Sequence, residues 1–187
     1  MHPVGIAVSG RIATGKTTIA HALASHLGWK YVGLGDYLRQ QVIASNRLPS
    51  REILQELGSR QVKVNPRQFC ENALQYFGWE PGMGVVIDGL RNMEVRSALL
   101  LILNPLPLFL IYCSAEDKVR NSRLDMREPG LHKRLAILEK HPIEQDVITT
   151  LPSFADLTID TGRNSTEQSI QQVLKWLRSR ENVDRSI

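Results

Sequence analysis

Five short runs of apolar residues, rich in β-branched side chains, are spaced along the chain. They lie at residues 4–9, 30–35, 84–89, 108–113 and 155–160. The first reads VGIAVS and the fourth LFLIYC, so nearly every position is apolar rather than every second one. This pattern is typical of strands buried on both faces of a parallel sheet. We therefore expect five parallel strands.

Segments with helical periodicity separate these runs. In the last of them, the stretch IQQVLKWL has apolar residues at the i, i+3, i+4 and i+7 positions that share one helix face. Ser165 and Gln168 just before it match a capping box. Ser114 and Asp117 predict a similar helix start after the fourth strand.

The alternation of strands and helices predicts an α/β protein with three layers, α/β/α, and a ligand site at the carboxyl ends of the strands. Two stretches are longer than a simple crossover: residues 36–79, which read as three helices, and residues 127–150, which begin polar and basic. Insertions of this size usually form lids or binding elements. No repeat or linker divides the 187 residues, so we expect a single domain.

Composition fits this class. Apolar residues make up 42% and charged residues 22% of the chain, close to the average for soluble globular proteins. No apolar run is long enough for a membrane span, and the first twenty residues lack a secretory signal pattern. Cys70 and Cys113 lie in different segments without metal-like spacing. We expect a cytoplasmic protein with two reduced thiols.

The formal charge is only +4, but basic residues cluster in the stretch EDKVRNSRLDMREPGLHKR. Such a cluster could bind nucleic acid or smaller phosphates. It contains no aromatic residue for base stacking, which disfavours a nucleic-acid partner. The alternative is a solvated helix face, partly neutralised by the acidic residues of the same stretch.

The stretch GRIATGKTT follows the first strand and matches the pattern G-x-x-x-x-G-K-T. In a P-loop of this kind the backbone wraps around a polyphosphate with its N–H groups pointing inward. The lysine reaches the β- and γ-phosphates, and the helix that follows adds its positive end. The sequence therefore predicts a site for a nucleoside triphosphate. Its predicted nucleotide-binding residues are Gly10, Ala13, Thr14, Gly15, Lys16, Thr17 and Thr18.

A second phosphate-related signal is VVIDG, an apolar strand that ends in Asp88. A carboxylate at the tip of a neighbouring strand can hold the water shell of Mg²⁺, and the P-loop threonine hydroxyl can ligate the ion. We expect Thr17 and Asp88 to hold Mg²⁺. An ordinary strand-to-turn sequence would look similar, so this signal depends on the P-loop beside it.

Four stretches in this order, GRIATGKTT, GLGDYLRQ, VIDGLR and RLDMR, resemble the P-loop nucleoside monophosphate kinases and their neighbours, including the dephospho-coenzyme A kinases. The resemblance covers nearly the whole chain, although only the P-loop is individually specific. It implies a P-loop NTPase fold with three parts. These are a CORE (residues 1–35, 80–126 and 151–187), a helical acceptor-binding insertion (36–79) and a short LID segment (127–150).

The resemblance also assigns arginines. Arg39 matches the arginine that grips the acceptor phosphate, and Arg91 matches one that does similar work. Arg123 and Arg127 match the pair that flanks the LID and neutralises the transferring phosphoryl group, and Arg134 is a weaker LID candidate. Phosphoryl transfer needs charge neutralisation more than covalent help, and arginine matches phosphate oxygens bidentately.

Asp36 bears most on the acceptor. A hydroxyl acceptor benefits from a carboxylate base, and dephospho-coenzyme A kinases carry an aspartate at the matching position. Asp36 could equally be a helix N-cap. The predicted arginines supply more positive charge than a hydroxyl needs, so we favour a phosphorylated acceptor, a nucleoside or deoxynucleoside monophosphate. The residues expected to act in catalysis are Lys16, Asp36, Asp88, Arg123 and Arg127.

The chain departs from the family at three points. Ala13 stands where these kinases usually have glycine, which restricts a positive φ. DGLR is one residue shorter than the adenylate kinase pattern, so Arg91 is expected to aim differently. His141 and Glu144 lie in HPIEQ, part of a stretch that matches no known substrate pattern. They could touch substrate, but a role at a helix start is favoured.

The expected activity is Mg-ATP-dependent phosphoryl transfer by a monomer or homodimer without a membrane partner. A hydroxyl-acceptor kinase of the dephospho-coenzyme A kinase type stays open as an alternative. So does a regulatory or nucleic-acid-associated P-loop ATPase.

Overall fold

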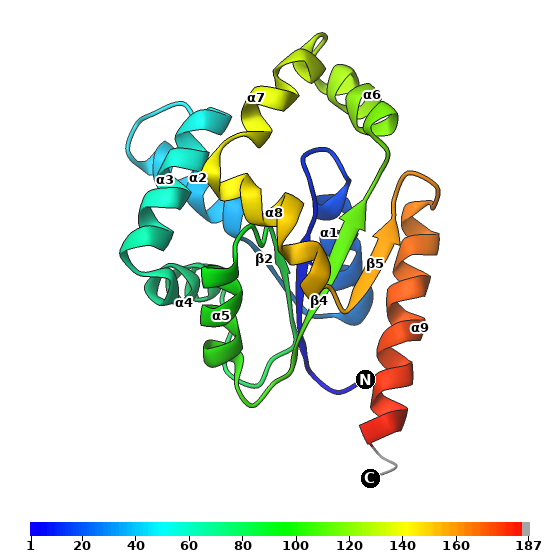
Figure 1. Cartoon of the computed structure of the whole chain (residues 1–187). Helices are drawn as coiled ribbons and strands as arrows, with labels where there is room; N and C mark the ends of the chain where they lie inside the picture. Colours follow the sequence, from blue (N-terminus) through cyan, green and yellow to red (C-terminus); the bar gives the residue numbers. More distant parts are fainter. Residues whose placement is uncertain (185–187) are drawn as a thin grey trace.

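The structure is a computed structural model that describes residues 1–184, with the side chains of residues 1–180. Its centre is a parallel sheet of five strands in the order β2-β3-β1-β4-β5 (Figure 1). The prediction of five parallel strands is therefore confirmed. The strands are β1 (Gly5–Ser9), β2 (Lys30–Gly33), β3 (Val85–Asp88), β4 (Leu108–Ser114) and β5 (Leu157–Asp160).

Helices connect the strands, and the long stretch after β2 folds into three helices, as predicted. The helices before the LID segment are α1 (Lys16–Leu27), α2 (Leu34–Ala44), α3 (Arg51–Val64), α4 (Pro66–Tyr76), α5 (Met93–Leu103) and α6 (Asp117–Arg127). The LID segment and the end of the chain contain η1 (Leu131–Arg134), α7 (Leu135–Glu139), η2 (Pro142–Glu144), α8 (Gln145–Thr149), η3 (Leu151–Phe154) and α9 (Thr166–Asp184).

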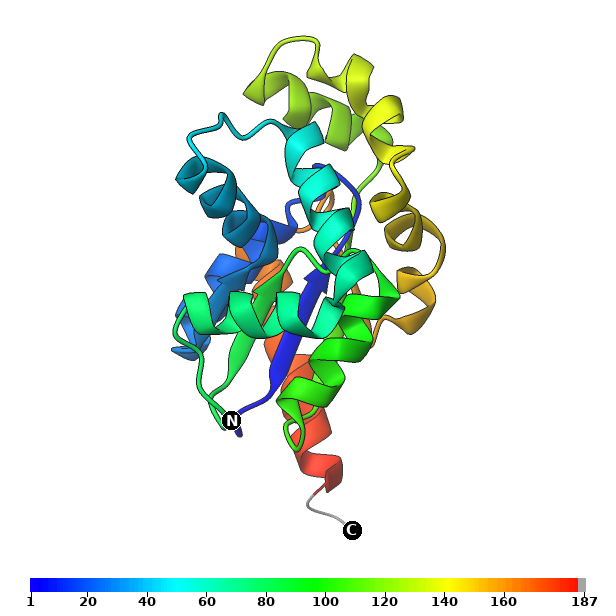
Figure 2. The same ribbon diagram turned by 90° about the vertical axis from the view of Figure 1, so that its left-hand side faces the viewer.

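The sheet is covered on both faces, which explains its uninterrupted apolar strands. Successive side chains of β1 enter opposite cores: Ile6 and Val8 pack with α1 and α9, whereas Ala7 packs with α2, α4 and α5. Figure 2 shows the second group of helices against the sheet, with α9 on its far side. The three-layer α/β/α prediction is confirmed.

The two predicted helix starts have different outcomes. The N–H of Gln168 donates to Ser165 Oγ (3.1 Å), and the N–H of Ser165 donates to Gln168 Oε1 (2.9 Å), so this capping box is confirmed. The prediction at Ser114 is wrong, because Ser114 is still part of β4 and its hydroxyl donates to the Ile159 carbonyl (3.2 Å). Glu116 occupies the N-cap position without a side-chain hydrogen bond.

A third, smaller apolar cluster lies outside the sheet. Ile12 and Ala13 of the P-loop pack against Leu124 of α6 and against Leu135 and Leu138 of the LID segment. The LID segment therefore rests on the loop that follows β1. None of the described helices is long and apolar enough to cross a membrane.

Gly10 offers a test of how tightly the loop after β1 is packed. Its φ is +149°, and a Cβ there would meet the Cys113 carbonyl and lie 2.7 Å from Thr14 Oγ1. Gly28 also has a positive φ (+65°), but a Cβ there meets nothing within 4 Å. We expect Gly28→Ala to lower the free energy of unfolding by about 1 kcal/mol, the cost of a left-handed alanine. Gly10→Ala should cost about 1–3 kcal/mol more, because the Cys113 backbone must shift. Urea unfolding of both variants measures the difference, and equal losses would contradict this packing argument.

Candidate active site

The P-loop connects β1 to α1 and contains three residues with a left-handed backbone. Gly10 and Gly15 have φ values of +149° and +80°. Ala13 has a φ of +65°, so it adopts the conformation that its side chain disfavours. The cost of about 1 kcal/mol for a left-handed alanine is offset by the contact of its methyl group with the apolar cluster under the LID segment.

Three successive carbonyls of the P-loop are held from outside the loop. Arg120 Nε donates to the Ile12 carbonyl (2.8 Å), Arg123 Nη1 to the Ala13 carbonyl (3.3 Å), and Thr161 Oγ1 to the Thr14 carbonyl (2.5 Å). Backbone N–H groups of a loop in this conformation form a concave anion site when the carbonyls point away from it. These bonds therefore hold the P-loop in the shape that binds phosphate.

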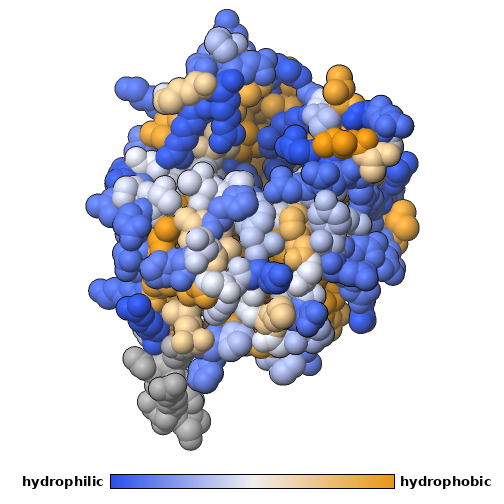
Figure 3. All heavy atoms as spheres, turned by 180° about the vertical axis from the view of Figure 1, so that it is seen from behind, coloured by the Kyte–Doolittle hydropathy of each residue, from blue (hydrophilic) through white to orange (hydrophobic). Residues whose placement is uncertain are grey.

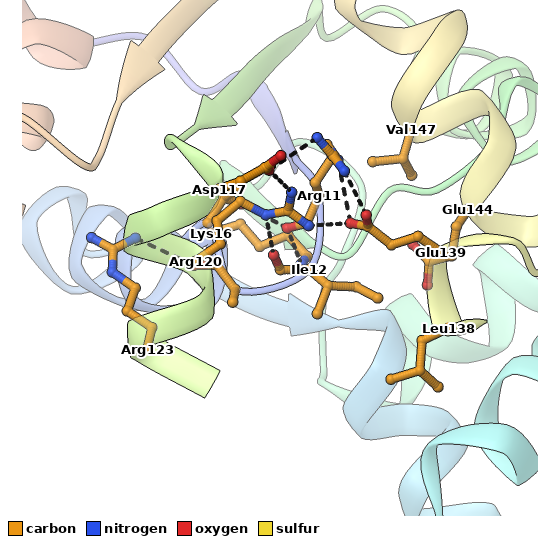
Figure 4. A network of polar contacts seen from close by, with 12 residues as sticks. Arg11, Ile12, Lys16, Asp117, Arg120, Arg123, Leu138, Glu139, Glu144 and Val147 are labelled. Atoms are coloured by element: carbon orange, nitrogen blue, oxygen red, sulfur yellow. Dashed lines mark hydrogen bonds and ion pairs between the residues drawn. The ribbon is translucent and has the colours of Figure 1, made fainter. Parts of the chain in front are cut away.

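Arg120 anchors this arrangement, and sequence analysis did not identify it. Its side chain is fully buried, and it pairs with Asp117 (2.6 Å) and with Glu139 of α7. Glu139 also accepts from Arg11 Nη2 (2.6 Å), so the LID segment is bound to the P-loop through one carboxylate (Figure 4). The one sequence signal for Arg120 was its place in the basic stretch, and this did not separate it from the other basic residues there.

The basic stretch is a solvated face only in part, because Lys118, Arg127, Lys133 and Arg134 are exposed, whereas Arg120 is buried and Arg123 half-buried. Arg120 and Arg123 of α6 bind the P-loop, Arg127 lines the cavity described below, and Arg134 pairs with Glu52 of α3. Most of its arginines therefore serve contacts within the chain.

Thr17 and Asp88 lie together, as predicted. Thr17 Oγ1 donates to Asp88 Oδ2 (2.6 Å), and Asp88 is buried at the end of β3 between β1 and β2. The other carboxylate oxygen, Asp88 Oδ1, is buried without a hydrogen-bond partner. Mg²⁺ and its water shell prefer oxygen ligands such as a hydroxyl and a carboxylate oxygen without a hydrogen-bond partner. These residues therefore fit the ion.

Lys16, the first residue of α1, lies beside this pair. Burial and the positive charge of Arg91 lower the pKa of its ammonium group to about 8, although the carboxylates of Asp88 and Glu144 oppose the shift. The shift comes mainly from burial, because the two arginine and two carboxylate charges around Lys16 oppose each other.

A cavity of about 250 Å³ opens at the carboxyl ends of the strands, among the P-loop, α2, α3 and the LID segment. The surface is hollowed at this end of the molecule (Figure 3). The predicted residues that line the cavity are Ala13, Gly15, Lys16, Thr17, Thr18, Asp36, Arg39, Asp88, Arg91 and Arg127. Gly10 and Thr14 do not line it, and Arg123 is turned to the P-loop carbonyl instead. Arg51 and Gln55 line it without having been predicted.

Asp36 is not a helix N-cap. Helix α2 begins at Leu34 with Gly33 as its N-cap, so Asp36 already lies in the first turn. Its carboxylate accepts from Tyr31 Oη (3.1 Å), which also lies 3.3 Å from Asp88 Oδ2. Burial and the two aspartates raise the pKa of Tyr31, so this phenol stays protonated. The Asp36 carboxylate is half exposed and faces the cavity.

His141 and Glu144 differ in their roles. His141 Nδ1 accepts from the N–H of Ile143 (3.3 Å) at the start of η2, as expected for a helix start. Glu144 is not a surface helix residue but a buried carboxylate, only 1% exposed, that pairs with Arg91. Arg91 thus lines the cavity and is also paired with a carboxylate of the LID segment.

Known proteins with similar sequences span most of this chain. A "Putative adenylate kinase" from Thermococcus kodakarensis is 26% identical over 174 residues, covering 92% of this chain and 85% of its own length. A "UPF0200 protein" from Aeropyrum pernix is 28% identical over 160 residues and covers 84% of each chain. No protein-family model matches the chain.

Among solved structures, the shikimate kinase from Acinetobacter baumannii aligns with a TM-score of 0.61 at 16% identity, covering 95% of this chain and 94% of its own. A gluconokinase from Sinorhizobium meliloti aligns with a TM-score of 0.57 at 14% identity, covering 99% and 98%. These likenesses concern the fold, and they agree with the P-loop and with the curated relatives. The chain therefore has the fold of the P-loop small-molecule kinases.

The lowered pKa of Lys16 predicts a pH-dependent stability of this protein. Between about pH 8 and pH 10.5 the unfolded chain binds a proton at Lys16 that the folded chain has lost, so the contribution of Lys16 to stability rises with pH. We expect the free energy of unfolding of wild type, minus that of Lys16→Met, to increase across this window. Urea unfolding at several pH values measures it, with the exposed Lys118→Met as control. A constant difference would show that the ammonium group is not disfavoured in the fold.

The Glu139 carboxylate is expected to contribute strongly to the stability of this protein. Glu139→Gln leaves the buried Arg120 with only Asp117 as a charged partner. We expect a loss of about 3 kcal/mol, the lower end of the range for breaking a buried pair, because Asp117 still compensates part of the charge. The control is Glu116→Gln, which removes an exposed pair with Arg163 and should cost less than about 1 kcal/mol. Equal losses in chemical denaturation would show that the buried network contributes no more than a surface pair.

Proposed function

We propose that this protein transfers the γ-phosphoryl group of Mg-ATP to a small phosphorylated acceptor, a nucleoside or deoxynucleoside monophosphate. The observation that carries the proposal is the convergence of four arginines on one cavity beside Lys16. They come from four parts of the chain: Arg39 from α2, Arg51 from α3, Arg91 from the loop after β3, and Arg127 from the end of α6. Two phosphorylated substrates facing each other need this much positive charge.

The residues divide the work by position. The P-loop N–H groups and Lys16 bind the β- and γ-phosphates, and Thr17 with Asp88 holds Mg²⁺. When bound, Mg²⁺ supplies charge that neutralises the phosphate oxygens. Arg127, at the entrance to the LID segment, lies where it can neutralise the group in transfer, while Arg39 and Arg91 orient the acceptor. In-line positioning and charge neutralisation are the main requirements of this reaction.

A hydroxyl acceptor is the second candidate, and one observation favours it. The Asp36 carboxylate does not cap a helix, and it faces the cavity next to Tyr31 and Asp88. A carboxylate in this place can accept the proton of a hydroxyl nucleophile. The relative from Thermococcus kodakarensis supports a nucleotide kinase, whereas the fold is shared with shikimate kinases and a gluconokinase.

The deciding experiment measures ATP consumption with Mg²⁺ against nucleoside monophosphates, deoxynucleoside monophosphates, nucleosides and dephospho-coenzyme A, with products identified by mass. We expect ADP plus a nucleoside diphosphate. Lys16→Ala should lower kcat about 10²–10³-fold, because a preorganised charge at the transferring group is lost. A phosphorylated hydroxyl would instead assign Asp36 as the base. ATP hydrolysis without any phosphorylated acceptor would favour a macromolecular partner.

A further inference from the structure

Glu144 has an unusual place for a carboxylate in an anion-binding region. It belongs to η2 of the LID segment, and its side chain is 1% exposed. It accepts from Gln55 Nε2 (3.0 Å), pairs with Arg91, and lies 3.6 Å from Arg51 Nη2. Three donors, from α3 and from the loop after β3, therefore meet one buried carboxylate.

The charges around Glu144 do not balance. Two guanidinium groups share one carboxylate, and Arg127 adds a third positive charge nearby. Burial and the charges of Arg91 and Arg127 lower the pKa of Arg51, and Glu144 opposes them. Burial alone would raise the pKa of Glu144, but Arg91, Gln55 and Arg51 hold it below its ordinary value. The carboxylate is therefore ionised, and its single negative charge does not balance the positive charges of the arginines around it.

Arg51 retains donors for another partner. Its Nε is buried and has no hydrogen-bond partner among the described residues, and its contact with Glu144 is longer than a hydrogen bond. Arg51, Arg91 and Gln55 line the cavity, whereas Glu144 is not among the lining residues and stands behind them. Both arginines thus line the space in which the acceptor would lie, and Arg51 is not fully hydrogen-bonded.

We propose that Arg51 and Arg91 bind the acceptor's phosphate together, and that Glu144 is the positioning residue that holds the two guanidinium groups side by side. This rests on the phosphorylated acceptor of the proposed function. A phosphate dianion supplies the missing negative charge, and its oxygens match two planar forks bidentately. No sequence motif assigned Arg51, which is the first residue of α3.

The test compares binding of nucleoside monophosphates with binding of the matching nucleosides by calorimetric titration. Arg51→Gln should weaken nucleoside monophosphate binding about 10–100-fold, the effect of losing charge-assisted hydrogen bonds, and leave nucleoside binding unchanged. Arg60→Gln, on the exposed face of the same helix, is the matched control and should change neither. Binding of Mg-ATP should be the same in all three proteins.

Two further variants separate positioning from bulk charge. Arg51→Lys keeps the positive charge but loses the planar guanidinium fork, so an intermediate loss of nucleoside monophosphate affinity is expected. This variant replaces Arg51→Gln if that variant does not fold.

Glu144→Gln adds one positive charge to the site. A purely electrostatic role would then tighten nucleoside monophosphate binding, whereas a positioning role weakens it and raises the acceptor KM more than the ATP KM. Tighter binding in Glu144→Gln would overturn the positioning role.

The failure of this inference is distinct from failure of the proposed function. If wild type binds and phosphorylates a nucleoside monophosphate while Arg51→Gln behaves like Arg60→Gln, the role of Arg51 is wrong and the proposed function stands. If wild type binds no nucleoside monophosphate but phosphorylates a hydroxyl acceptor, the proposed function is wrong and the two-arginine site falls with it.

Discussion

The site depends on the hydrogen bonds that the P-loop carbonyls accept from side chains outside the loop. A loop of this length has no regular hydrogen-bond ladder, so its N–H groups face inward only if the carbonyls have partners elsewhere. Arg120, Arg123 and Thr161 supply these partners for three successive residues. Thr17 and the ammonium group of Lys16, at the start of α1, take their positions from a loop fixed in this way.

Buried counter-charges make the cationic site compatible with folding. Arg11 and Arg120 share Glu139, and Arg51 and Arg91 share Glu144. A buried guanidinium without a partner would be costly, whereas full neutralisation would remove the attraction for phosphate. Asp117 also pairs with Arg11 and Arg120, so these two charges are matched, whereas the single carboxylate of Glu144 between Arg51 and Arg91 leaves a positive remainder near the cavity. The charge that the substrates compensate on binding is therefore already present in the fold.

Much of the fold and part of the site could be predicted from the sequence, because both depend on local patterns. Uninterrupted apolar runs identified the five strands, and the G-x-x-x-x-G-K-T spacing identified the P-loop and its helix. Arg51, Arg120 and Glu144 could not be assigned in this way, since their roles come from partners 93, 19 and 53 residues away along the chain. Spacing alone also could not show that Arg123 turns to the P-loop carbonyl rather than to the cavity.

The two carboxylates of the LID segment connect the two halves of the site. Glu139 binds residues around the P-loop, and Glu144, in the next turn of the chain, binds arginines on the acceptor side. Both belong to short helical turns of one continuous segment, so a displacement of this segment would loosen both sets of arginines together. For the proposed phosphoryl transfer, this arrangement would favour the reaction only when both substrates are in place, because each half of the site then stabilises the segment that the other half also needs. It would also limit the transfer of the phosphoryl group to water, since an incomplete site lacks the ordered charges that the reaction requires.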